Sequence, residues 1–356
     1  MRTRILSLLL LVALLAACGG GGDDEGNGGG GGTQAVEEEP VLCPLTGVEA
    51  PAGVDVNRPA LAVKIDNAPP ARPQAGVEAA DVVYEELGEG GLTRFLTIFH
   101  CNDAGSVGPV RSARNVDPEI LKEYEPALFA YSGANTQVLA KISDASWIVD
   151  LKHGDHGDAY TRASDRRAPY NLMTTTAAIR GLEGADAGGP PESALEFNAE
   201  VLNPPAPESP SPGATASPEA PAAAPGNSVS LSYSNANVVR YNYDPATKAY
   251  LRFNGDTPHQ LANGNQLSAV NVVVQKVRTA PGTVRDASGT LTVDTIVVGS
   301  GEATVLRGGT AVTGTWNRAS LDDQTTFTDA SGQPIEFAPG SVFIHLVPQE
   351  RAVTVQ

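Results

Sequence analysis

A segment rich in proline and alanine constrains the fold most, because a compact domain cannot run through it. Residues 203–226 contain eight Pro and seven Ala among 24 positions. This composition buries too little apolar surface to form a core and is typical of a semi-extended spacer. At 356 residues the chain is long enough for two domains. The sequence therefore predicts a first folded unit over 43–196 and a second over 228–356, joined by a spacer over 197–227.

The first unit mixes strand-like and helix-like segments. Apolar and β-branched runs predict strands over 60–65, 81–87 and 92–99, and Gly88-Glu89-Gly90-Gly91 between the last two is a hairpin signature. Asp117-Pro118-Glu119 is typical of a helix start, with Asp117 as the N-cap. We expect an α/β or α+β fold for this unit.

The second unit has a different pattern, with short apolar or alternating runs separated by turn sequences. Strands are predicted at 229–233, 238–243, 249–253, 270–277, 290–298, 302–307 and 342–347. Many short strands at a spacing of about ten to fifteen residues are typical of all-β architectures. The second unit is therefore predicted to be mostly antiparallel β, as a barrel or a sandwich.

The N-terminus has the features of a lipoprotein signal peptide. Arg2 and Arg4 precede the apolar run Ile5–Ala17, which is too short to span a bilayer and suits a secretory signal. The run ends in Leu15-Ala16-Ala17-Cys18, which resembles the bacterial lipobox, so Cys18 is the expected lipidation site. We predict a signal peptide over 1–17 and a flexible glycine- and acid-rich leash over 18–42.

Charge and hydropathy restrict the location and the partners. The chain has 41 Asp and Glu against 24 Lys and Arg, a net charge of −17, whereas nucleic-acid binders have a clustered basic surface. No further apolar run after the first 20 residues is long enough to cross a membrane. We therefore expect an extracytoplasmic protein that is attached to the cell membrane by its N-terminal lipid and has no nucleic-acid partner.

The two remaining cysteines, Cys43 and Cys101, form an even pair in an oxidising compartment. A disulfide between them would close a loop of about 59 residues and would stabilise the fold by roughly 4 kcal/mol through loop-closure entropy. The alternative is two buried free thiols. We favour the disulfide because it would fasten the start of the first folded unit.

Three arginines stand close together in this acidic chain. A hairpin turn at Gly88–Gly91 would place Glu85 opposite Arg94 as a cross-strand ion pair. Arg111 and Arg114 follow in a glycine-bounded segment. Arginine is the preferred donor for bidentate contacts with phosphate or carboxylate, so one interpretation is an anion site. The alternative is a set of structural salt bridges.

Other candidate residues carry weaker signals. Asp66 and Glu85 are the carboxylates that we place with the three arginines in the candidate anion site. We expect no cofactor and assign no catalytic residue, because the sequence has no G-x-S-x-G, S-x-x-K or phosphate-loop motif. Four potential metal ligands stand within six residues, but loop spacing is weak support for a metal site; they are His153, Asp155, His156 and Asp158.

A family resemblance rests on motifs that run in order through both units. In the first unit they include Val63-Lys64-Ile65-Asp66-Asn67, Ala80-Asp81-Val82-Val83-Tyr84-Glu85, Thr93-Arg94-Phe95, Gly108-Pro109-Val110-Arg111-Ser112-Ala113-Arg114 and Arg166-Arg167-Ala168-Pro169-Tyr170-Asn171-Leu172. In the second unit they are Tyr250-Leu251-Arg252, Gly314-Thr315-Trp316 and Pro339-Gly340. These motifs resemble the YerB-like lipoproteins, a bacterial family of unknown function with an N-terminal and a C-terminal domain. The resemblance implies a location and an architecture but no reaction. The family pattern often has His at the position of Tyr170, so an imidazole role is not expected there.

Two functions remain open from the sequence. The first is binding of a cell-envelope glycan or protein partner without catalysis. The second is an envelope enzyme that handles a phosphate- or pyrophosphate-linked glycan through Arg94, Arg111 and Arg114. The order of strand, arginine, strand and P-V-R-S-A-R weakly resembles the LytR–CpsA–Psr phosphotransferases, whose arginines hold a polyprenyl pyrophosphate.

Overall fold

The computed structural model describes residues 40–182, 184–185, 188–202, 223–285 and 289–356. The expected signal peptide, Cys18, most of the leash and most of the spacer lie outside these residues. Residues 40–356 group into one compact unit. Within the described part of the chain, no helix is long and apolar enough to cross a membrane.

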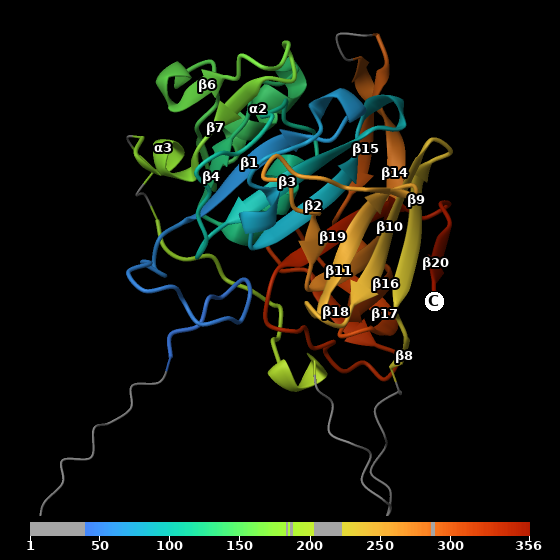
Figure 1. Cartoon of the computed structure of the whole chain (residues 1–356). Helices are drawn as coiled ribbons and strands as arrows, with labels where there is room; N and C mark the ends of the chain where they lie inside the picture. The colour runs from blue at the N-terminus through green and yellow to red at the C-terminus, as the bar shows by residue number, and fades with distance from the viewer. Residues whose placement is uncertain (1–39, 183, 186–187, 203–222, 286–288) are drawn as a thin grey trace, which may run out of the picture. The chain divides into compact units, whose positions relative to one another are not determined.

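One sheet of twelve strands runs through both halves of the chain (Figure 1). Its strands follow the order β18-β17-β16-β14-β19-β2-β3-β1-β4-β5, with β15 paired to β14 and β8 paired to β17. The N-terminal half contributes β1 (Ala60–Asp66), β2 (Val82–Leu87), β3 (Thr93–Phe99), β4 (Ala127–Ala130) and β5 (Ile148–Asp150). The C-terminal half contributes β8 (Ala224–Pro225), β14 (Asn271–Arg285), β15 (Leu291–Ile296), β16 (Gly299–Arg307), β17 (Thr310–Arg318), β18 (Thr326–Asp329) and β19 (Val342–Pro348).

The two halves of this sheet meet at a parallel pair of strands. β19 pairs with β2 from Val82 opposite Val342 to Glu85 opposite His345. β19 is a mostly apolar run that is buried along its length, and β2 is buried from Val82 to Glu86, as expected for strands covered on both faces. The two parts of the chain on either side of the proline-rich segment therefore share one backbone hydrogen-bond network.

A second sheet of six strands belongs to the C-terminal half. Its order is β12-β11-β10-β9-β20, with β13 paired to β11, and all its pairs are antiparallel. Its strands are β9 (Ser228–Ser234), β10 (Asn237–Asp244), β11 (Ala249–Asn254), β12 (Thr257–Pro258), β13 (Ser268–Ala269) and β20 (Val353–Val355). In β9 every second residue is buried, so one face of the strand packs inward. The predicted antiparallel β unit is confirmed, and its described strands form open sheets as in a sandwich.

Short helices complete the N-terminal half. These are α1 (Asp117–Leu121), α2 (Thr136–Asp144) and α3 (Thr176–Arg180), with 3₁₀ turns η1 (Pro69–Ala71), η2 (Val77–Ala79), η3 (Glu89–Gly91), η4 (Lys122–Tyr124), η5 (Gly157–Ala159) and η6 (Ala199–Leu202). The remaining strands, β6 (Tyr160–Arg162) and β7 (Leu172–Thr174), form a two-stranded sheet. The mixture confirms the predicted α/β or α+β class. The predicted N-cap is wrong: Val116 caps α1, and Asp117 is a buried residue of its first turn.

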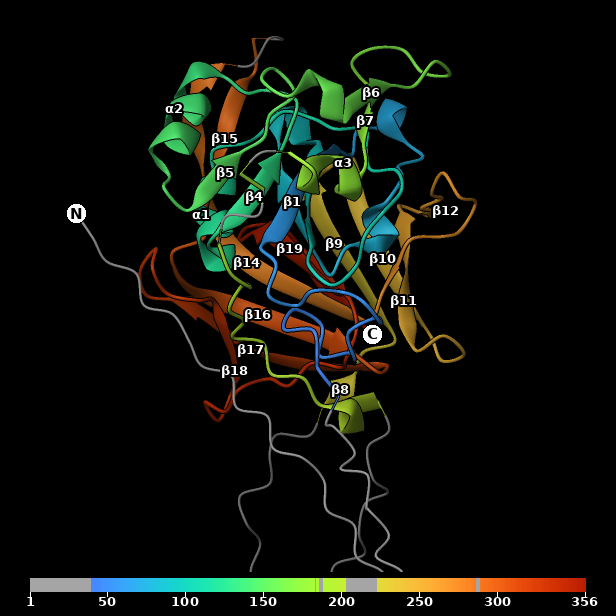
Figure 2. The same cartoon turned by 90° about the vertical axis from the view of Figure 1, so that its left-hand side faces the viewer.

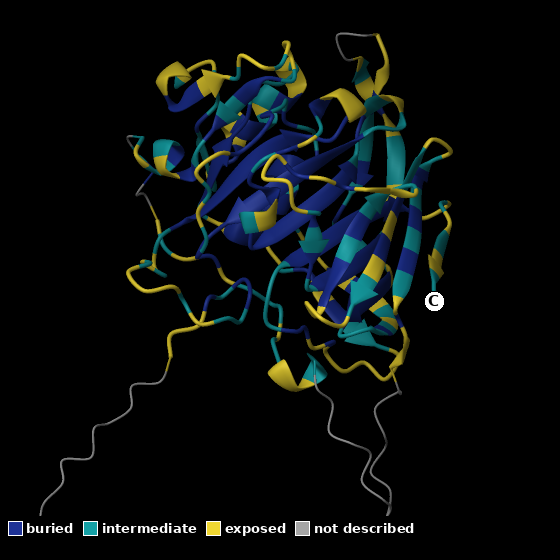
Figure 3. Cartoon of the chain, in the orientation of Figure 1, coloured by how far each residue is buried: buried dark blue, intermediate teal, exposed yellow. Residues whose placement is uncertain are grey.

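Two hydrophobic cores lie on opposite faces of the long sheet, and both halves of the chain contribute to each core. On one face, residues of β9 and β10 such as Leu231 and Val239 pack against Val63 and Phe95. On the other face, α1 and α2 cover Leu96, Ile98 and their neighbours. Figure 2 shows α1 and α2 on one side of the sheet and β9–β11 on the other, and Figure 3 shows the buried strands between them. The long sheet is therefore the middle layer.

The predicted disulfide between Cys43 and Cys101 is confirmed, with a Cα–Cα distance of 6.0 Å. Both cysteines are 1% exposed. The bond joins the start of the compact unit to the chain just after β3, so it fastens the N-terminal segment to the long sheet.

Candidate functional site

The three predicted arginines line one pocket of about 620 Å³. Arg94 comes from β3, and Arg111 and Arg114 come from the extended segment before α1. A fourth arginine, Arg285 at the end of β14, joins them from the C-terminal half. We call this site the arginine pocket; the rest of its lining is Ala68, Glu89, Gly90, Leu92, Ser112, Ala113, Gly133, Ala134, Asn135, Tyr170 and Thr290.

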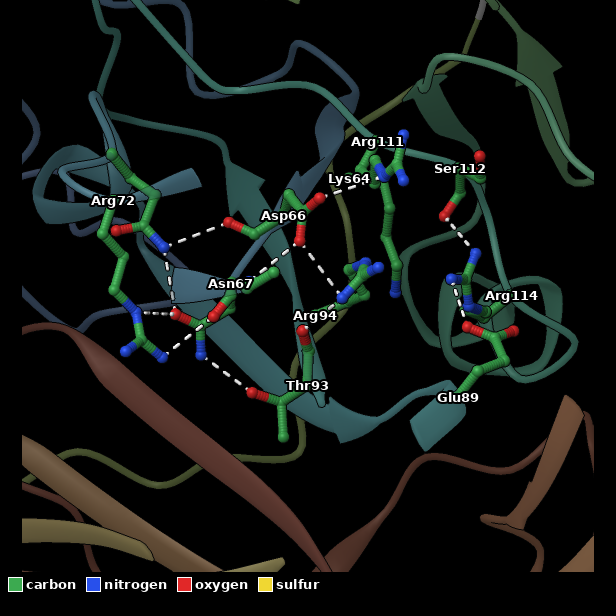
Figure 4. A network of polar contacts seen from close by, with 12 residues as sticks. Lys64, Asp66, Asn67, Arg72, Glu89, Thr93, Arg94, Arg111, Ser112 and Arg114 are labelled. Carbon is green, nitrogen blue, oxygen red and sulfur yellow. Dashed lines mark hydrogen bonds and ion pairs between the residues drawn. The ribbon is translucent and has the colours of Figure 1, made fainter. Parts of the chain in front are cut away.

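Asp66 holds two of the arginines from beneath the pocket (Figure 4). Its Oδ1 lies 3.1 Å from Nη1 of Arg94, and its Oδ2 lies 3.0 Å from Nε of Arg111. The carboxylate is 0% exposed, and the pairing of β1 with β3 places Asp66 directly opposite Arg94. A buried carboxylate at this position orients both guanidinium groups, because a buried charge needs a partner.

Arg114 is held by a separate set of contacts. Its Nη2 lies 2.6 Å from Oε2 of Glu89, and its Nη1 donates hydrogen bonds to the carbonyl oxygens of Ser112 and Ala113. The backbone N–H of Arg114 donates to Asp117 at 2.6 Å. Each of the three arginines therefore has a carboxylate partner and also lines the common pocket. The salt bridges that one interpretation of the sequence expected are therefore present. The same three arginines also line the pocket in which the other interpretation would place an anion.

The pocket has an excess of positive charge. Four arginines line it, whereas Asp66 and Glu89 are the carboxylates paired with them. Burial lowers the pKa of Arg94, Asp66 opposes this effect, and the neighbouring Arg114 and Arg111 lower the pKa further. The buried Nε atoms of Arg94 and Arg114 have no hydrogen-bond partner among the described residues. An anion in the pocket would relieve the repulsion between the guanidinium groups.

The predicted ion pair between Glu85 and Arg94 is wrong by one residue of register. The strands pair Glu86 with Arg94 and Glu85 with Phe95. The hairpin loop is one residue longer than expected, because Glu89–Gly91 form a 3₁₀ turn in which Leu92 N–H donates to the carbonyl of Glu89, and Gly88 N–H closes the loop on the carbonyl of Leu92. A slip of one residue moves each side chain to the other face of the sheet. Glu85 therefore lies on the opposite face from Arg94 and outside the arginine pocket.

Glu85 instead pairs with Arg252 of β11, a residue that the site prediction missed. Nη2 of Arg252 lies 2.9 Å from Oε1 and 2.8 Å from Oε2 of Glu85, and both side chains are 0% exposed. Thr93 and Asn67 also donate to Glu85. Burial alone would raise the pKa of Glu85, but Arg252 and its other donors hold it well below the usual value. This buried ion pair joins the two halves of the chain.

Sequence patterning contained a signal for Arg252. Tyr250 and Arg252 stand two residues apart on a strand, and Tyr250 is fully buried. A charged residue at an inward position of an alternating strand requires a buried partner of opposite charge. The pattern could have predicted a buried ion pair, although it could not have named Glu85.

A second buried cluster lies next to the arginine pocket. The Lys64 ammonium contacts both Glu86 and Asp117, the latter at 2.6 Å, and all three side chains are buried. The backbone N–H of Arg111 donates a hydrogen bond to the backbone carbonyl of Lys64. Burial and the nearby Asp117 raise the pKa of Glu86 to about 7, with Lys64 opposing the shift. Glu86 therefore takes up a proton in the folded state at a higher pH than in the unfolded chain.

This pKa gives a prediction on stability. Because the pKa of Glu86 is raised in the folded state, its protonation stabilises the fold. This contribution is fully present when the pH is below the usual pKa of 4.5, and it is lost as the pH rises to about 7. The variant Glu86→Gln has no such proton to lose. Between pH 5 and pH 7.5 we expect the free energy of unfolding of the wild type to fall by roughly 1–3 kcal/mol relative to that of Glu86→Gln. Urea unfolding of both proteins measures this difference. A constant difference at all pH values would contradict the assignment.

The four potential metal ligands do not form a cluster. No group of three or more His, Cys, Asp or Glu suited to a metal is found in the residues that the structure describes. Asp155 instead forms an ion pair with Lys152, and the His153 ring makes an edge contact with Tyr160 at 5.4 Å between centroids. Tyr170, in contrast, lines the arginine pocket, where the Arg111 guanidinium lies 5.8 Å from the centre of its ring.

These observations define a β-rich protein with an arginine-lined candidate anion site, and comparison with known proteins then gives the family. The model for the N-terminal domain of the protein of unknown function DUF3048 matches residues 45–188, and the model for its C-terminal domain matches residues 229–344. The chain belongs to this family, and the predicted resemblance is confirmed.

A relative and a solved structure are similar over most of the chain. "Putative lipoprotein YerB" of Bacillus subtilis (strain 168) is 27% identical over 318 residues, which covers 88% of each protein. The crystal structure of YerB protein from Bacillus subtilis has a TM-score of 0.71 at 23% identity and covers 88% of this chain and 99% of that one. The structural similarity shows the fold.

Proposed function

We propose that the protein is held on the extracytoplasmic face of the cell membrane by a lipid on Cys18 and binds an anionic glycan of the cell envelope in the arginine pocket, without catalysing a reaction. The observation that carries the binding proposal is the convergence of four arginines on one pocket in a chain of net charge −17. Arginine binds phosphate and carboxylate through paired hydrogen bonds, and its weakly hydrated guanidinium suits such partly buried sites.

One further observation supports binding rather than catalysis, and another supports the lipid anchor. Among the described residues, Glu89 is the carboxylate that lines the pocket, and it pairs with Arg114. Asp66 and Glu86 lie next to the pocket arginines, are 0% exposed and are also engaged in ion pairs. A general acid or base instead needs a carboxyl group that exchanges a proton with the ligand. The relative named as a lipoprotein supports the anchoring proposal, as does the lipobox that ends at Cys18.

Pyrophosphate is the simplest probe of the binding proposal. Because a ligand that binds only the folded state stabilises it, we expect millimolar pyrophosphate to raise the melting temperature of the mature protein, and added salt to reduce this effect. The same sample should release no phosphate. Release of phosphate would favour the alternative function as an envelope enzyme, and an unchanged melting temperature would favour a protein partner.

The anchoring proposal predicts the behaviour of Cys18→Ala. Without the thiol that takes the lipid, the variant should be found in the medium or remain an uncleaved precursor, because an acidic chain has no attraction to anionic headgroups. Membrane fractionation followed by mass determination of the N-terminus measures both outcomes. A variant that is processed and still bound to membranes would contradict the lipid anchor.

A further inference from the structure

We propose that the ligand of the arginine pocket is a sugar that carries the negative charge on itself, as a phosphate or a carboxylate, and that Tyr170 is the residue that selects the sugar ring. This inference rests on the proposed function, because it assumes that the arginines bind the charged group. It adds that the charged group and the recognised sugar ring belong to the same sugar unit, and it names the residue that contacts the ring.

The pocket has room for more than a single anion. Its volume of about 620 Å³ lies within the range of roughly 300–1,000 Å³ that holds small organic ligands. An inorganic phosphate contacts two or three guanidinium groups and leaves most of such a volume to water. The ligand that fills the pocket therefore has an uncharged part of considerable size.

The lining of the pocket also contains neutral residues that suit such a ligand. Beside the arginines it includes Ser112, Gly133, Ala134 and Asn135. Small residues leave room for a ring, and hydroxyl and amide groups exchange hydrogen bonds with sugar hydroxyls.

Asn135 is fixed in place before any ligand binds. It is the N-cap of α2, and its Oδ1 accepts a hydrogen bond from the N–H of Val138 at 3.0 Å. With the oxygen engaged, the amide NH₂ is the group that Asn135 can offer to a ligand hydroxyl. A polar group held by a helix cap orients a ligand with little loss of side-chain entropy.

Tyr170 brings an aromatic surface next to the charged group. Its half-buried ring lines the pocket with Arg111, whose guanidinium carbon is 5.8 Å from the ring centre. A sugar whose phosphate or carboxylate binds Arg111 therefore has its ring within reach of the tyrosine. Aromatic rings supply a large rigid apolar surface with a polar tip, which matches the apolar face and hydroxyl edge of a sugar.

The test is calorimetric titration of the mature protein with four probes: inorganic phosphate, glucose, glucose 1-phosphate and glucuronate. We expect glucose 1-phosphate to bind at least tenfold more tightly than phosphate, and glucose alone not to bind. Tyr170→Ala should remove this gain without changing the affinity for phosphate, and Tyr170→Phe should keep it. Glucuronate separates the two sources of charge, because tight binding of this probe would identify a carboxylate ligand.

The possible failures are distinguishable. If phosphate binds but glucose 1-phosphate and glucuronate bind no more tightly, or if Tyr170→Ala weakens phosphate and sugar phosphate equally, the inference about the sugar is overturned and the proposed anion site stands. If none of the charged probes binds, the proposed function itself is overturned. Circular dichroism of both Tyr170 variants confirms that a loss of affinity reflects the pocket and not the fold.

Discussion

Replacing Arg252 by alanine is expected to destabilise the protein by about 3–5 kcal/mol, the usual cost of leaving a buried charge without its partner. The variant removes both guanidinium contacts to Glu85, a carboxylate that is 0% exposed. Because the pair also links β11 to β2, the loss affects the contact between the two halves of the chain. Urea unfolding of Arg252→Ala at pH 7 measures the effect.

Two control variants give this prediction its specificity. Arg240 on the neighbouring strand β10 forms an exposed ion pair with Asp256, and removing such a surface pair typically changes stability by less than about 1 kcal/mol. The double variant Glu85→Gln/Arg252→Met leaves no unpaired charge and should be more stable than Arg252→Ala. Equal stability of Arg252→Ala and Arg240→Ala would show that the buried pair does not hold the two halves together.

Replacing Arg111 by alanine is expected to have the largest effect on binding. The loss of a charge-assisted contact costs roughly 1.5–3 kcal/mol, so affinity for an anionic ligand should fall between about 10-fold and 100-fold. Stability should fall by less than in Arg252→Ala, because the Arg111 side chain is 27% exposed and, although Oδ2 of Asp66 loses its ion-pair partner, Oδ1 keeps its contacts with Arg94 and with the N–H of Ala68. Titration calorimetry and thermal melting of the same sample measure both quantities.

Lysine at position 111 should restore little affinity, because an ammonium cannot make the paired contacts of a guanidinium. Arg240→Ala, which removes an arginine outside the pocket, should bind as wild type. Arg114→Ala would change stability as well as binding, because Arg114 also forms an ion pair with Glu89 and donates hydrogen bonds to two backbone carbonyls. It therefore tests binding less directly than Arg111→Ala. An Arg111→Ala protein that binds as wild type would exclude Arg111 from the site.

The sequence predicted those features of the fold and of the site that depend on a short stretch of residues or on a simple count. The strands that became β1, β2 and β3 are short runs rich in apolar and β-branched residues, and Cys43 and Cys101 were the pair left once Cys18 was assigned to lipidation. The grouping of Arg94, Arg111 and Arg114 was also predictable, because three arginines in a short stretch of an acidic chain stand out. The strands and the arginines are recognised within a short stretch of sequence, whereas the disulfide followed from the number of cysteines.

The sequence was not sufficient where a contact depends on register or on long-range pairing. The hairpin at 88–92 could not be placed to one residue, because Gly90 and Gly91 adopt positive φ angles of 68° and 77° and close a 3₁₀ turn within the loop. The shift of one residue places Arg94 opposite Glu86 and Glu85 opposite Phe95. The pairing of β2 with β19 brings together residues more than 200 positions apart, and hydrophobic periodicity holds no information on such partners.

The most direct test of the central claim is a titration of the mature protein with acidic cell-wall glycan fragments, compared with the same fragments after removal of their phosphate groups and reduction of their carboxylates. The arginine pocket predicts that the charged fragments bind wild type, that their neutral counterparts do not, and that Arg111→Ala binds the charged fragments about 10-fold to 100-fold more weakly. Equal binding of charged and neutral fragments, or full binding by Arg111→Ala, would contradict an anion site in this pocket.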